Sequence, residues 1–229
     1  ANAEYVAVRD DGAIAARPSG LNDEEAATLP FGAMSALAFL RDIAGLKAGE
    51  KILIYGASGA VGVAAVQLAK HFGATVTGVC SAANLDLVRS LGADHVIDYT
   101  KADFTKAAGV YDVILDAVGG TSFTRAKRVL APNGRHVFVN TKFRQLLQML
   151  WTSLRPGKRV ICGFSSGSSQ TDLKLIKDLV ESRVLRPVVD RTYQLNEIVE
   201  AHRYVDSGRK RGSVIVTVER AANTLRKVA

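Results

Sequence analysis

The sequence has little cysteine and no long apolar run. Its 229 residues include only two cysteines, Cys80 and Cys162, which are too few for a disulfide framework and do not form a C-x-x-C pair. Both lie in apolar runs that favour buried, reduced thiols, and this usage is typical of a cytoplasmic protein. No apolar stretch reaches the roughly 18–20 residues that cross a bilayer. We therefore expect no membrane partner.

Nucleic-acid-binding motifs are also lacking. The formal net charge is +8, and part of it is clustered in the basic tripeptide at 209–211. A basic surface attracts nucleic acid, anionic lipid or phosphorylated small molecules. No helix-turn-helix, zinc finger or aromatic-interleaved RNA-binding pattern accompanies these cations. We therefore expect no nucleic-acid partner.

What is present is an ordinary globular composition, with 48% hydrophobic and 23% charged residues. The length fits one large domain plus a fraction of a second. Apolar runs rich in β-branched residues alternate with segments of helical periodicity. Such continuous runs are typical of strands buried on both faces of a parallel sheet. We predict six strands, at 51–55, 75–80, 95–99, 112–116, 136–139 and 159–162.

The segments between these strands predict helices at 61–72, 85–91, 121–130 and 143–154. Thr121 is the expected cap of the third helix, which Pro132 and Asn133-Gly134 would close. Alternating strands and helices predict a doubly wound parallel α/β sheet of the Rossmann type at 47–182. The two flanking segments look like parts of a second domain wrapped around this sheet. The first is 1–46, with a predicted strand at 3–8 and a linking helix. The second is 183–229, with a predicted helix at 195–205 and a strand at 213–218.

The predicted helix at 143–154 has a strong apolar stripe. Because such a stripe is the usual core-facing side of a surface helix, we predict a core-packing or lid helix. A lipid-facing or partner-facing surface is the alternative. The stripe consists of Phe143, Leu146, Leu147, Leu150, Trp151 and Leu154.

A glycine-rich turn joins the first predicted strand to the first predicted helix. The turn reads Gly56, Ala57, Ser58, Gly59, Ala60, Val61, Gly62, with the spacing G-x-x-G-x-x-G. Glycine permits a sharp turn and a close approach of a pyrophosphate, while the helix N-terminus presents free N–H groups to it. Because the turn lies between a strand and a helix, we interpret it as a dinucleotide site. A purely structural turn is the alternative.

The end of the second predicted strand bears on the choice of cofactor. NAD sites place an acid there for the ribose 2′-hydroxyl, but no acid occurs between Gly73 and Asp86. Ser81 and Asn84 are able to hydrogen-bond a 2′-phosphate, so NADP is favoured over NAD. This segment supplies no cation before Arg89. S-adenosylmethionine, the competing ligand, would also normally require an acid on this strand.

Six stretches of the sequence match a known pattern in order and spacing: 29–37, 46–51, 56–62, 91–99, 116–120 and 201–204. These stretches closely resemble the medium-chain dehydrogenase/reductase superfamily, and their variants look like its NADPH-using, quinone oxidoreductase-like branch. The resemblance covers nearly the whole chain.

The resemblance implies hydride transfer from NADPH to a quinone, enone or similar activated carbonyl. It also implies a homodimer and a GroES-like β-barrel catalytic domain, of which 1–46 and 183–229 are remnants. Pyrophosphate would bind at 56–62. On the adenosine side of the cofactor, Ser81 and Tyr99 would contact the 2′-phosphate and adenosine, and Val118 and Gly119 would flank the ribose. Ser35 would pack on the nicotinamide. The residues that would approach the nicotinamide are Asn140, Thr141, Gly163 and Phe164. No residue is identified as an acid–base catalyst, and Tyr55, Asp112 and Asp116 are interpreted as structural.

The sequence departs from the family pattern in three places. Ala82-Ala83 stands where NADPH-using relatives often have Lys or Arg, and Gly212-Ser213 stands where the last strand often opens with Gly-Lys. Phe31 lies in the segment where zinc-dependent relatives carry a cysteine ligand. The four histidines are scattered and a catalytic zinc needs three protein ligands, so we expect no metal.

The part of the catalytic domain that precedes residue 3 in relatives is not in this sequence. That part forms the opposite wall of the substrate cleft in the family. The alternative to a reductase is therefore a truncated or non-catalytic NADP(H)-binding module.

Overall fold

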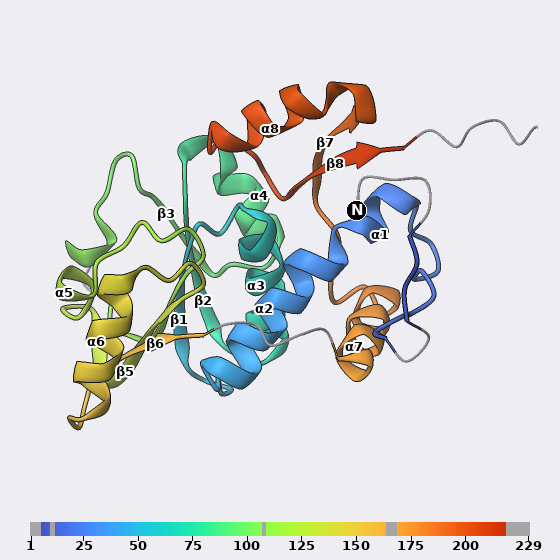
Figure 1. The fold of residues 1–229 in the computed structure, drawn as a ribbon. Helices are drawn as coiled ribbons and strands as arrows, with labels where there is room; N and C mark the ends of the chain where they lie inside the picture. The colour runs from blue at the N-terminus through green and yellow to red at the C-terminus, as the bar shows by residue number, and fades with distance from the viewer. Residues whose placement is uncertain (1–5, 10–11, 107–108, 164–168, 219–229) are drawn as a thin grey trace, which may run out of the picture.

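The computed structural model describes residues 6–9, 12–106, 109–163 and 169–218 (Figure 1). Its centre is a parallel sheet of six strands in the order β3-β2-β1-β4-β5-β6. The strands are β1 Lys51–Tyr55, β2 Thr75–Cys80, β3 His95–Asp98, β4 Tyr111–Asp116, β5 Leu130–Phe138 and β6 Arg159–Cys162. This is the strand order of the doubly wound Rossmann fold, so the predicted fold class is confirmed.

The sheet separates two hydrophobic cores because successive side chains of a strand point to opposite faces. Ile52 and Ile54 belong to the core beneath α3 (Ala60–His71), whereas Leu53 belongs to the core on the other face. All three side chains are fully buried. Burial on both faces explains why β1 reads as a continuous apolar run.

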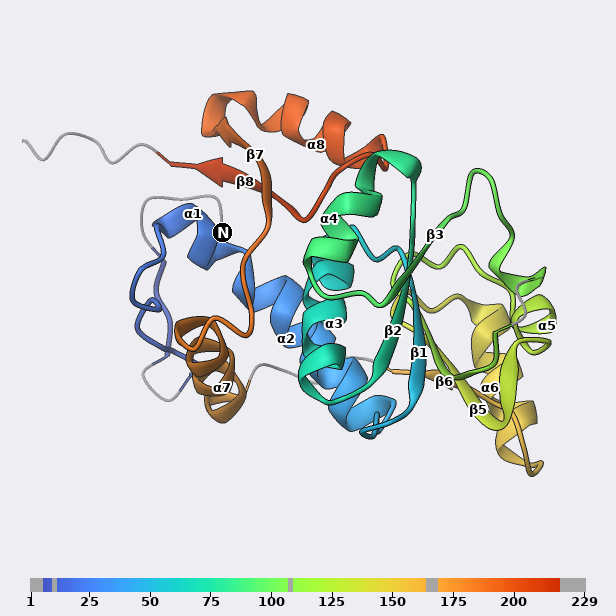
Figure 2. The same ribbon diagram turned by 180° about the vertical axis from the view of Figure 1, so that it is seen from behind.

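Helices cover both faces of the sheet (Figures 1 and 2). α3 and α4 (Leu85–Ser90) lie on one face, with α2 (Met34–Leu37) packed against α3. α5 (Phe123–Ala126) and α6 (Phe143–Ser153) lie on the other face. Among the described residues no helix is long and apolar enough to cross a membrane.

The N-terminal segment differs in part from its prediction. Of the strand expected at 3–8, residues 1–5 lie outside the described part, and 6–8 form no strand. Val6 and Val8 are exposed, since no described strand pairs with them. A helical segment follows at 23–43: α1 (Asp23–Ala27), the π-helical turn η1 (Leu29–Ala33), α2, and a second π-helical turn η2 (Ala38–Ile43).

The helix expected at 121–130 is mostly absent. Only Phe123–Ala126 is helical, and β5 already begins at Leu130. Thr121 does not cap the helix, because its hydroxyl and its backbone N–H both donate to Asp116. Pro132 consequently lies within β5 instead of closing a helix.

The C-terminal segment folds back onto the first face. α7 (Gln170–Glu181) leads into β7 (Val189–Gln194), a 3-10 turn η5 (Leu195–Glu197), α8 (Ile198–Asp206) and β8 (Ser213–Thr217). β7 and β8 form a separate parallel pair. The predicted helix at 195–205 and the strand from Ser213 are thus present. The core beneath α3 contains residues from all three predicted domains, at 29–44, 52–137 and 176–185. The division of the chain into these three domains therefore stays a prediction.

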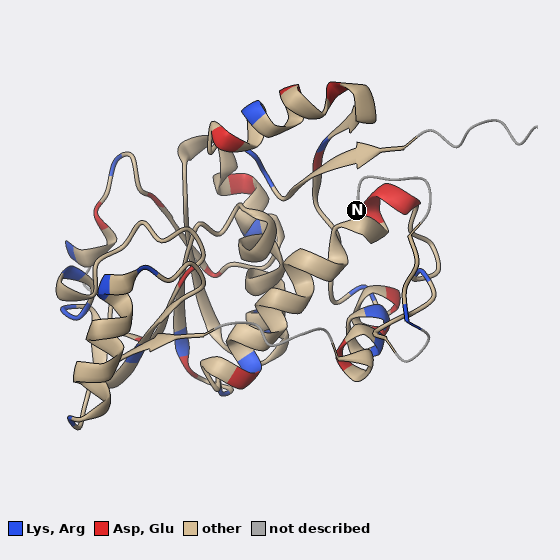
Figure 3. Cartoon of the chain, in the orientation of Figure 1, with Lys and Arg blue, Asp and Glu red and all other residues tan. Residues whose placement is uncertain are grey.

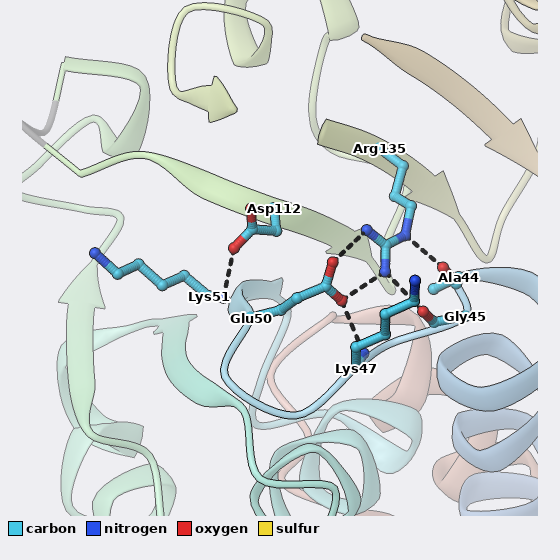
Figure 4. Close-up of polar contacts among 7 residues, drawn as sticks. All are labelled: Ala44, Gly45, Lys47, Glu50, Lys51, Asp112 and Arg135. Carbon is cyan, nitrogen blue, oxygen red and sulfur yellow. Dashed lines mark hydrogen bonds and ion pairs between the residues drawn. The ribbon is translucent and has the colours of Figure 1, made fainter. Parts of the chain in front are cut away.

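A bidentate ion pair fastens the amino ends of the strands (Figure 4). Arg135 of β5 donates to both oxygens of Glu50, at 2.8 and 2.7 Å, and to the carbonyl oxygens of Ala44 and Gly45. The guanidinium holds the pKa of the Glu50 carboxyl below its ordinary value. Nearby, Asp112 accepts a hydrogen bond of 2.8 Å from the backbone N–H of Lys51. These contacts stabilise the edge opposite the one where the predicted site lies.

Candidate functional site

The predicted site residues gather at the carboxyl edge of the sheet. They directly follow β1, β2, β3, β4, β5 and β6, so the parallel order brings them to one edge. In doubly wound folds, ligands bind at this edge, where the strand order reverses; here β1 and β4 flank that point. The exceptions are Ser35, which lies on α2, and Phe164, which lies outside the described residues.

The glycine turn is built for close backbone approach. Gly56 has a φ of 82°, a conformation that L side chains rarely adopt, and a Cβ there would lie 2.3 Å from Cγ2 of Val118. The N–H groups of Gly56 and Ala57 donate to the carbonyl of Val79 at 3.0 and 3.1 Å. The turn therefore holds the loop after β4 against the end of β1.

Helix α3 begins at this turn without a side-chain cap. Its N-cap residue is Gly59, and no described side chain accepts a hydrogen bond from the first amides of the helix. Uncapped N-terminal amides, together with the positive end of the helix dipole, form an anion-binding site. Ala60 and Val61 supply two of these first backbone amides.

Gly62 lets α3 pack tightly against the residues that follow β1, as its place in the glycine spacing predicts. A Cβ at this position would lie 2.1 Å from the carbonyl oxygen of Gly56 and 2.8 Å from Cα of Ala57. The missing side chain therefore makes room for the turn itself, and α3 packs directly beneath it. Gly62 shapes the site from inside.

Ser58 and Ser81 are brought together by Asn84. The Asn84 amide donates to the hydroxyl oxygens of Ser58, at 3.1 Å, and of Ser81, at 3.2 Å. Ser58 and Asn84 are buried. The sequence predicts that Asn84 donates to a 2′-phosphate. In the structure, its amide instead donates to two hydroxyl oxygens and positions them.

Tyr99 lies next to Ser81 along the sheet edge. Its backbone N–H donates to the carbonyl of Cys80 at 3.1 Å, and its exposed ring lies 6.4 Å from that of Tyr55, centroid to centroid. Tyr55 also contacts Phe104, at 5.8 Å. Burial raises the pKa of the Tyr55 phenol, and Asp116 and Tyr99 add to the effect.

The edge also holds an acid that sequence reasoning missed. Asp98 ends β3 in register with Cys80. Its Oδ1 accepts hydrogen bonds from the hydroxyl and the backbone N–H of Thr100, at 2.7 and 3.0 Å, and the hydroxyl contact is the main cause of its lowered pKa. The Oδ1 atom of Asp98 is therefore hydrogen-bonded within the turn that follows β3. The position of Asp98 near Ser81 follows only from the pairing of β2 with β3.

The loop that carries Val118 and Gly119 is organised by the fully buried carboxylate of Asp116. Asp116 accepts hydrogen bonds from the backbone N–H groups of Val118, Gly119 and Thr121, at 3.0, 2.7 and 2.8 Å. It also accepts one from the Thr121 hydroxyl. The Asp116 side chain therefore fixes the loop in place beside Gly56.

His136 completes this network from β5. Its Nε2 lies 2.9 Å from the Thr121 hydroxyl oxygen. That hydroxyl donates its one proton to Asp116, so it must accept from an Nε2–H group, which fixes the histidine tautomer. Burial lowers the His136 pKa to about 4, with Asp116 opposing the shift, so the ring is neutral near pH 7. The sequence indicates a structural role for Asp116 but does not reveal that Thr121 and His136 are its partners.

The residues predicted near the nicotinamide lie at the ends of β5 and β6. The Asn140 amide donates to the carbonyl of Val118 at 3.4 Å. The Thr141 hydroxyl is buried without a hydrogen bond of standard geometry, near Cys162. Burial raises the pKa of that thiol, with an opposing contribution from Thr141. A Cβ on Gly163 would lie 2.4 Å from Cδ1 of Ile43, so this glycine abuts η2.

Ser35 lies on α2, which packs against α3. Gly32, one turn earlier, packs so closely on α3 that a Cβ there would lie 2.6 Å from the carbonyl oxygen of Ala60. α2 therefore runs past the first turn of α3. Ser35 itself is partly exposed.

The basic tripeptide at 209–211 lies beside the glycine turn. The backbone N–H of Gly212 donates to the carbonyl of Ser58 at 2.7 Å, and Gly212 pairs with Gly59. Lys210 donates to the carbonyl of Gly212 at 3.0 Å, and burial lowers its pKa. This placement depends on a contact between residues about 150 positions apart, which sequence reasoning did not anticipate.

A groove of about 400 Å³ lies away from the carboxyl edge, between α1, α4 and the segment before β7, where Asn22, Glu25, Leu87 and Arg186 help to line it. In the described ranges, no group of three His, Cys, Asp or Glu side chains comes together to hold a metal.

Comparison with known proteins identifies the family. A profile of the family described as zinc-binding dehydrogenase matches residues 91–216, more than half of the chain. The chain is 34% identical to the mouse (Mus musculus) mitochondrial NAD(P)H oxidoreductase RTN4IP1, over 94% of this chain and 60% of the relative. It is also 34% identical to tomato (Solanum lycopersicum) 2-methylene-furan-3-one reductase, over 93% of this chain and 52% of the relative.

Solved structures agree. The quinone oxidoreductase from Coxiella burnetii superimposes with a TM-score of 0.80 at 29% identity, covering 89% of this chain and 63% of that one. The sheet topology thus defines a Rossmann-type α/β protein. The chain belongs to the zinc-binding dehydrogenase family, as a quinone oxidoreductase-like member of the medium-chain dehydrogenase/reductase superfamily. It spans about 60% of the length of the relatives named first.

Proposed function

We propose that the carboxyl edge of the sheet binds NADP(H), and that the chain carries the cofactor-binding part of a reductase for a quinone, enone or similar activated carbonyl. The observation that carries the proposal is the uncapped N-terminus of α3 at a glycine turn. The residues present fit a dinucleotide: the backbone amides of the first turn of α3, at 60–62, would hold the pyrophosphate, and Asn84 holds the hydroxyls of Ser58 and Ser81 together after β1 and β2.

The bound cofactor would supply a hydride from C4 of its nicotinamide, the chemistry that the names of the relatives imply. The protein's part is to position the reactants. Asp116 and Thr121 hold the Val118–Gly119 loop along the adenosine ribose, while Asn140 and Thr141 border the nicotinamide side. His136 is fully buried, so the proton that accompanies the hydride would come from solvent.

Three further expectations belong to this proposal. Zinc independence rests on Phe31 and the scattered histidines. A homodimer would pair through β6, the outer strand of the sheet. A cytoplasmic location rests on the two cysteines alone, and the relative RTN4IP1 is by name mitochondrial.

We predict that NADPH binds at least about tenfold more tightly than NADH, because the end of β2 carries no acid and Oδ1 of the nearby Asp98 is held by Thr100. Ser81→Asp should lower NADPH affinity by more than about tenfold through charge repulsion, and spare NADH. Ser81→Ala, which removes only the hydroxyl, should cost a few-fold. Calorimetric titration of the three proteins decides this. NADH binding as tightly as NADPH to the native protein would refute the assignment.

The second candidate is a non-catalytic NADP(H)-binding module, favoured by the full burial of Asp116 and His136, which are joined to each other through Thr121. We predict that the reductase consumes NADPH and forms hydroquinone in equal amounts, followed by absorbance at 340 nm and by chromatography. Saturable NADPH binding without turnover on quinones or enones would overturn the reductase assignment and favour the module.

A further inference from the structure

The loop between α8 and β8 brings three consecutive cations to the glycine turn. These cations are Arg209, Lys210 and Arg211. Figure 3 shows this blue stretch between the two elements, close to the end of α3 that the glycine turn enters. The segment after β2, by contrast, supplies no cation before Arg89. Positive charge therefore reaches the turn from a part of the chain far away in sequence.

Backbone contacts fix the end of this loop against the turn. The N–H of Gly212 donates to the carbonyl oxygen of Ser58 at 2.7 Å, and Gly212 pairs with Gly59, the N-cap residue of α3. Gly212 has a φ of 64°, and a Cβ there would lie 2.2 Å from the carbonyl oxygen of Val188. Conformation and space thus both require glycine. The loop is held in one position beside the start of α3.

Of the three cations, Lys210 takes part in this contact. Its Nζ donates to the carbonyl oxygen of Gly212 at 3.0 Å. Arg209 is exposed, and the exposed guanidinium of Arg211 lies 4.0 Å from the carboxylate of Asp190. The Lys210 ammonium is therefore hydrogen-bonded to the residue that pairs with the N-cap of α3.

The charge of Lys210 is not neutralised within the described part of the chain. Burial lowers its pKa, and the charge of Asp190 opposes the shift without forming an ion pair. The Asp190 carboxylate accepts hydrogen bonds from the Tyr204 hydroxyl, at 2.6 Å, and from the N–H of Arg211, at 2.9 Å. Taking an ammonium partly out of water without an opposite charge costs free energy. An anion bound beside Lys210 would offset that cost.

We propose that Lys210 binds the pyrophosphate of the dinucleotide, together with the first backbone amides of α3. This inference rests on the proposed function, because it takes the carboxyl edge as the cofactor site. The ammonium would donate to a phosphate oxygen from the β8 side of the turn, while the amides donate from the helix side. The bound cofactor would thereby tie the C-terminal segment to the sheet.

The position of the ammonium favours the pyrophosphate over the 2′-phosphate. Its hydrogen-bond partner Gly212 pairs with Gly59, where α3 begins. The hydroxyl proposed for the 2′-phosphate, that of Ser81, instead follows β2 and is held by Asn84. NADPH and NADH share the pyrophosphate. Loss of the ammonium should therefore weaken both cofactors by the same factor and leave the preference between them unchanged.

Lys210→Met removes the charge and keeps an unbranched side chain. In calorimetric titration it should lower the affinity for NADPH and for NADH by at least about tenfold each, because charge-assisted hydrogen bonds are among the stronger ones. The native affinity should also fall more steeply with salt than that of the variant. Without cofactor, Lys210→Met should melt at no lower temperature than the native protein, since it loses a charge that lacks an ionic partner.

Arg209→Met is the matched control, because it makes the same replacement at an exposed neighbour. It should bind both cofactors within about twofold of the native affinity. A native chain that binds neither dinucleotide would contradict the proposed function itself. Native binding with unchanged affinity in Lys210→Met would overturn this inference alone. So would an equal loss in Arg209→Met, which indicates general attraction, a lower melting temperature of Lys210→Met, which indicates a structural role, or a loss confined to NADPH, which indicates the 2′-phosphate.

Discussion

Replacing Gly59 with Asp is expected to abolish NADPH binding and leave the fold intact. Gly59 has φ −80° and ψ 174°, a conformation open to any residue, and a Cβ there meets only the Gly56 carbonyl oxygen, at 3.5 Å. Asp is among the best N-cap residues, so its carboxylate would occupy the first amides of α3 and repel a pyrophosphate. We expect an affinity loss of at least about 100-fold, since two like charges would meet at a partly desolvated site.

The matched variants separate charge from size. Gly59→Ala adds only a Cβ and should lose a few-fold in affinity, while Gly59→Asn should fall between Ala and Asp. Calorimetric titration gives the affinities, and thermal unfolding should show Gly59→Asp to be at least as stable as the native protein. If Gly59→Asp binds NADPH normally, the glycine turn is purely structural.

Replacing Gly62 with Val is expected to prevent stable folding. The added Cβ would meet three atoms of the turn backbone, the nearest at 2.1 Å, and backbone cannot swing aside as a side chain does. We expect a loss of more than about 4 kcal/mol in the free energy of unfolding, the range in which single substitutions become exceptional. The defect lies in the fold, because the Cβ does not point to the ligand side.

Gly62→Ala makes the test sharper. Alanine stabilises a helix by about 1 kcal/mol relative to glycine when nothing else changes. At Gly62 it should nevertheless lower stability, whereas at Gly59, the control position, it should be nearly neutral. Denaturant unfolding followed by circular dichroism gives both values. A Gly62→Ala protein as stable as the native one would show that the backbone of the turn shifts at little cost in free energy.

The sequence predicts the sheet well where a strand is buried on both faces. β1, β2 and β6 begin and end at the predicted residues, since continuous apolar runs bounded by glycine or charge leave little ambiguity. β5 was predicted too short, because Pro132 and Asn133-Gly134 read locally as a turn. The prediction of a strand at 3–8 is wrong for residues 6–8, because an alternation of apolar and polar residues does not by itself supply a neighbouring strand to pair with.

The site was predictable as far as it depends on local order. Residues that follow parallel strands must share one edge, so Ser81, Tyr99, Val118 and Asn140 could be placed there from the strand pattern, although their ligand roles stay predictions. Contacts between distant segments could not be foreseen. Asp98 beside Cys80 and Gly212 on Ser58 depend on strand pairing and on chain return.

Helix α6 shows a further limit of periodicity. The prediction that its apolar stripe packs in the core is wrong, since the six side chains are 36% to 79% exposed. A helical period does not say which side faces the sheet. That choice depends on Thr152 and Gln145, whose hydrogen bonds form only when β6 and the start of the helix are in place. The same stripe is thus compatible with a core and with a surface.

The most direct test of the account is titration of the native chain with NADPH and, separately, with S-adenosylmethionine. We predict one NADPH bound per chain, no heat from S-adenosylmethionine, and loss of the NADPH signal in Gly59→Asp. Absence of NADPH binding at submillimolar concentration, or binding of S-adenosylmethionine instead, would contradict the assignment of the carboxyl edge as a nicotinamide dinucleotide site.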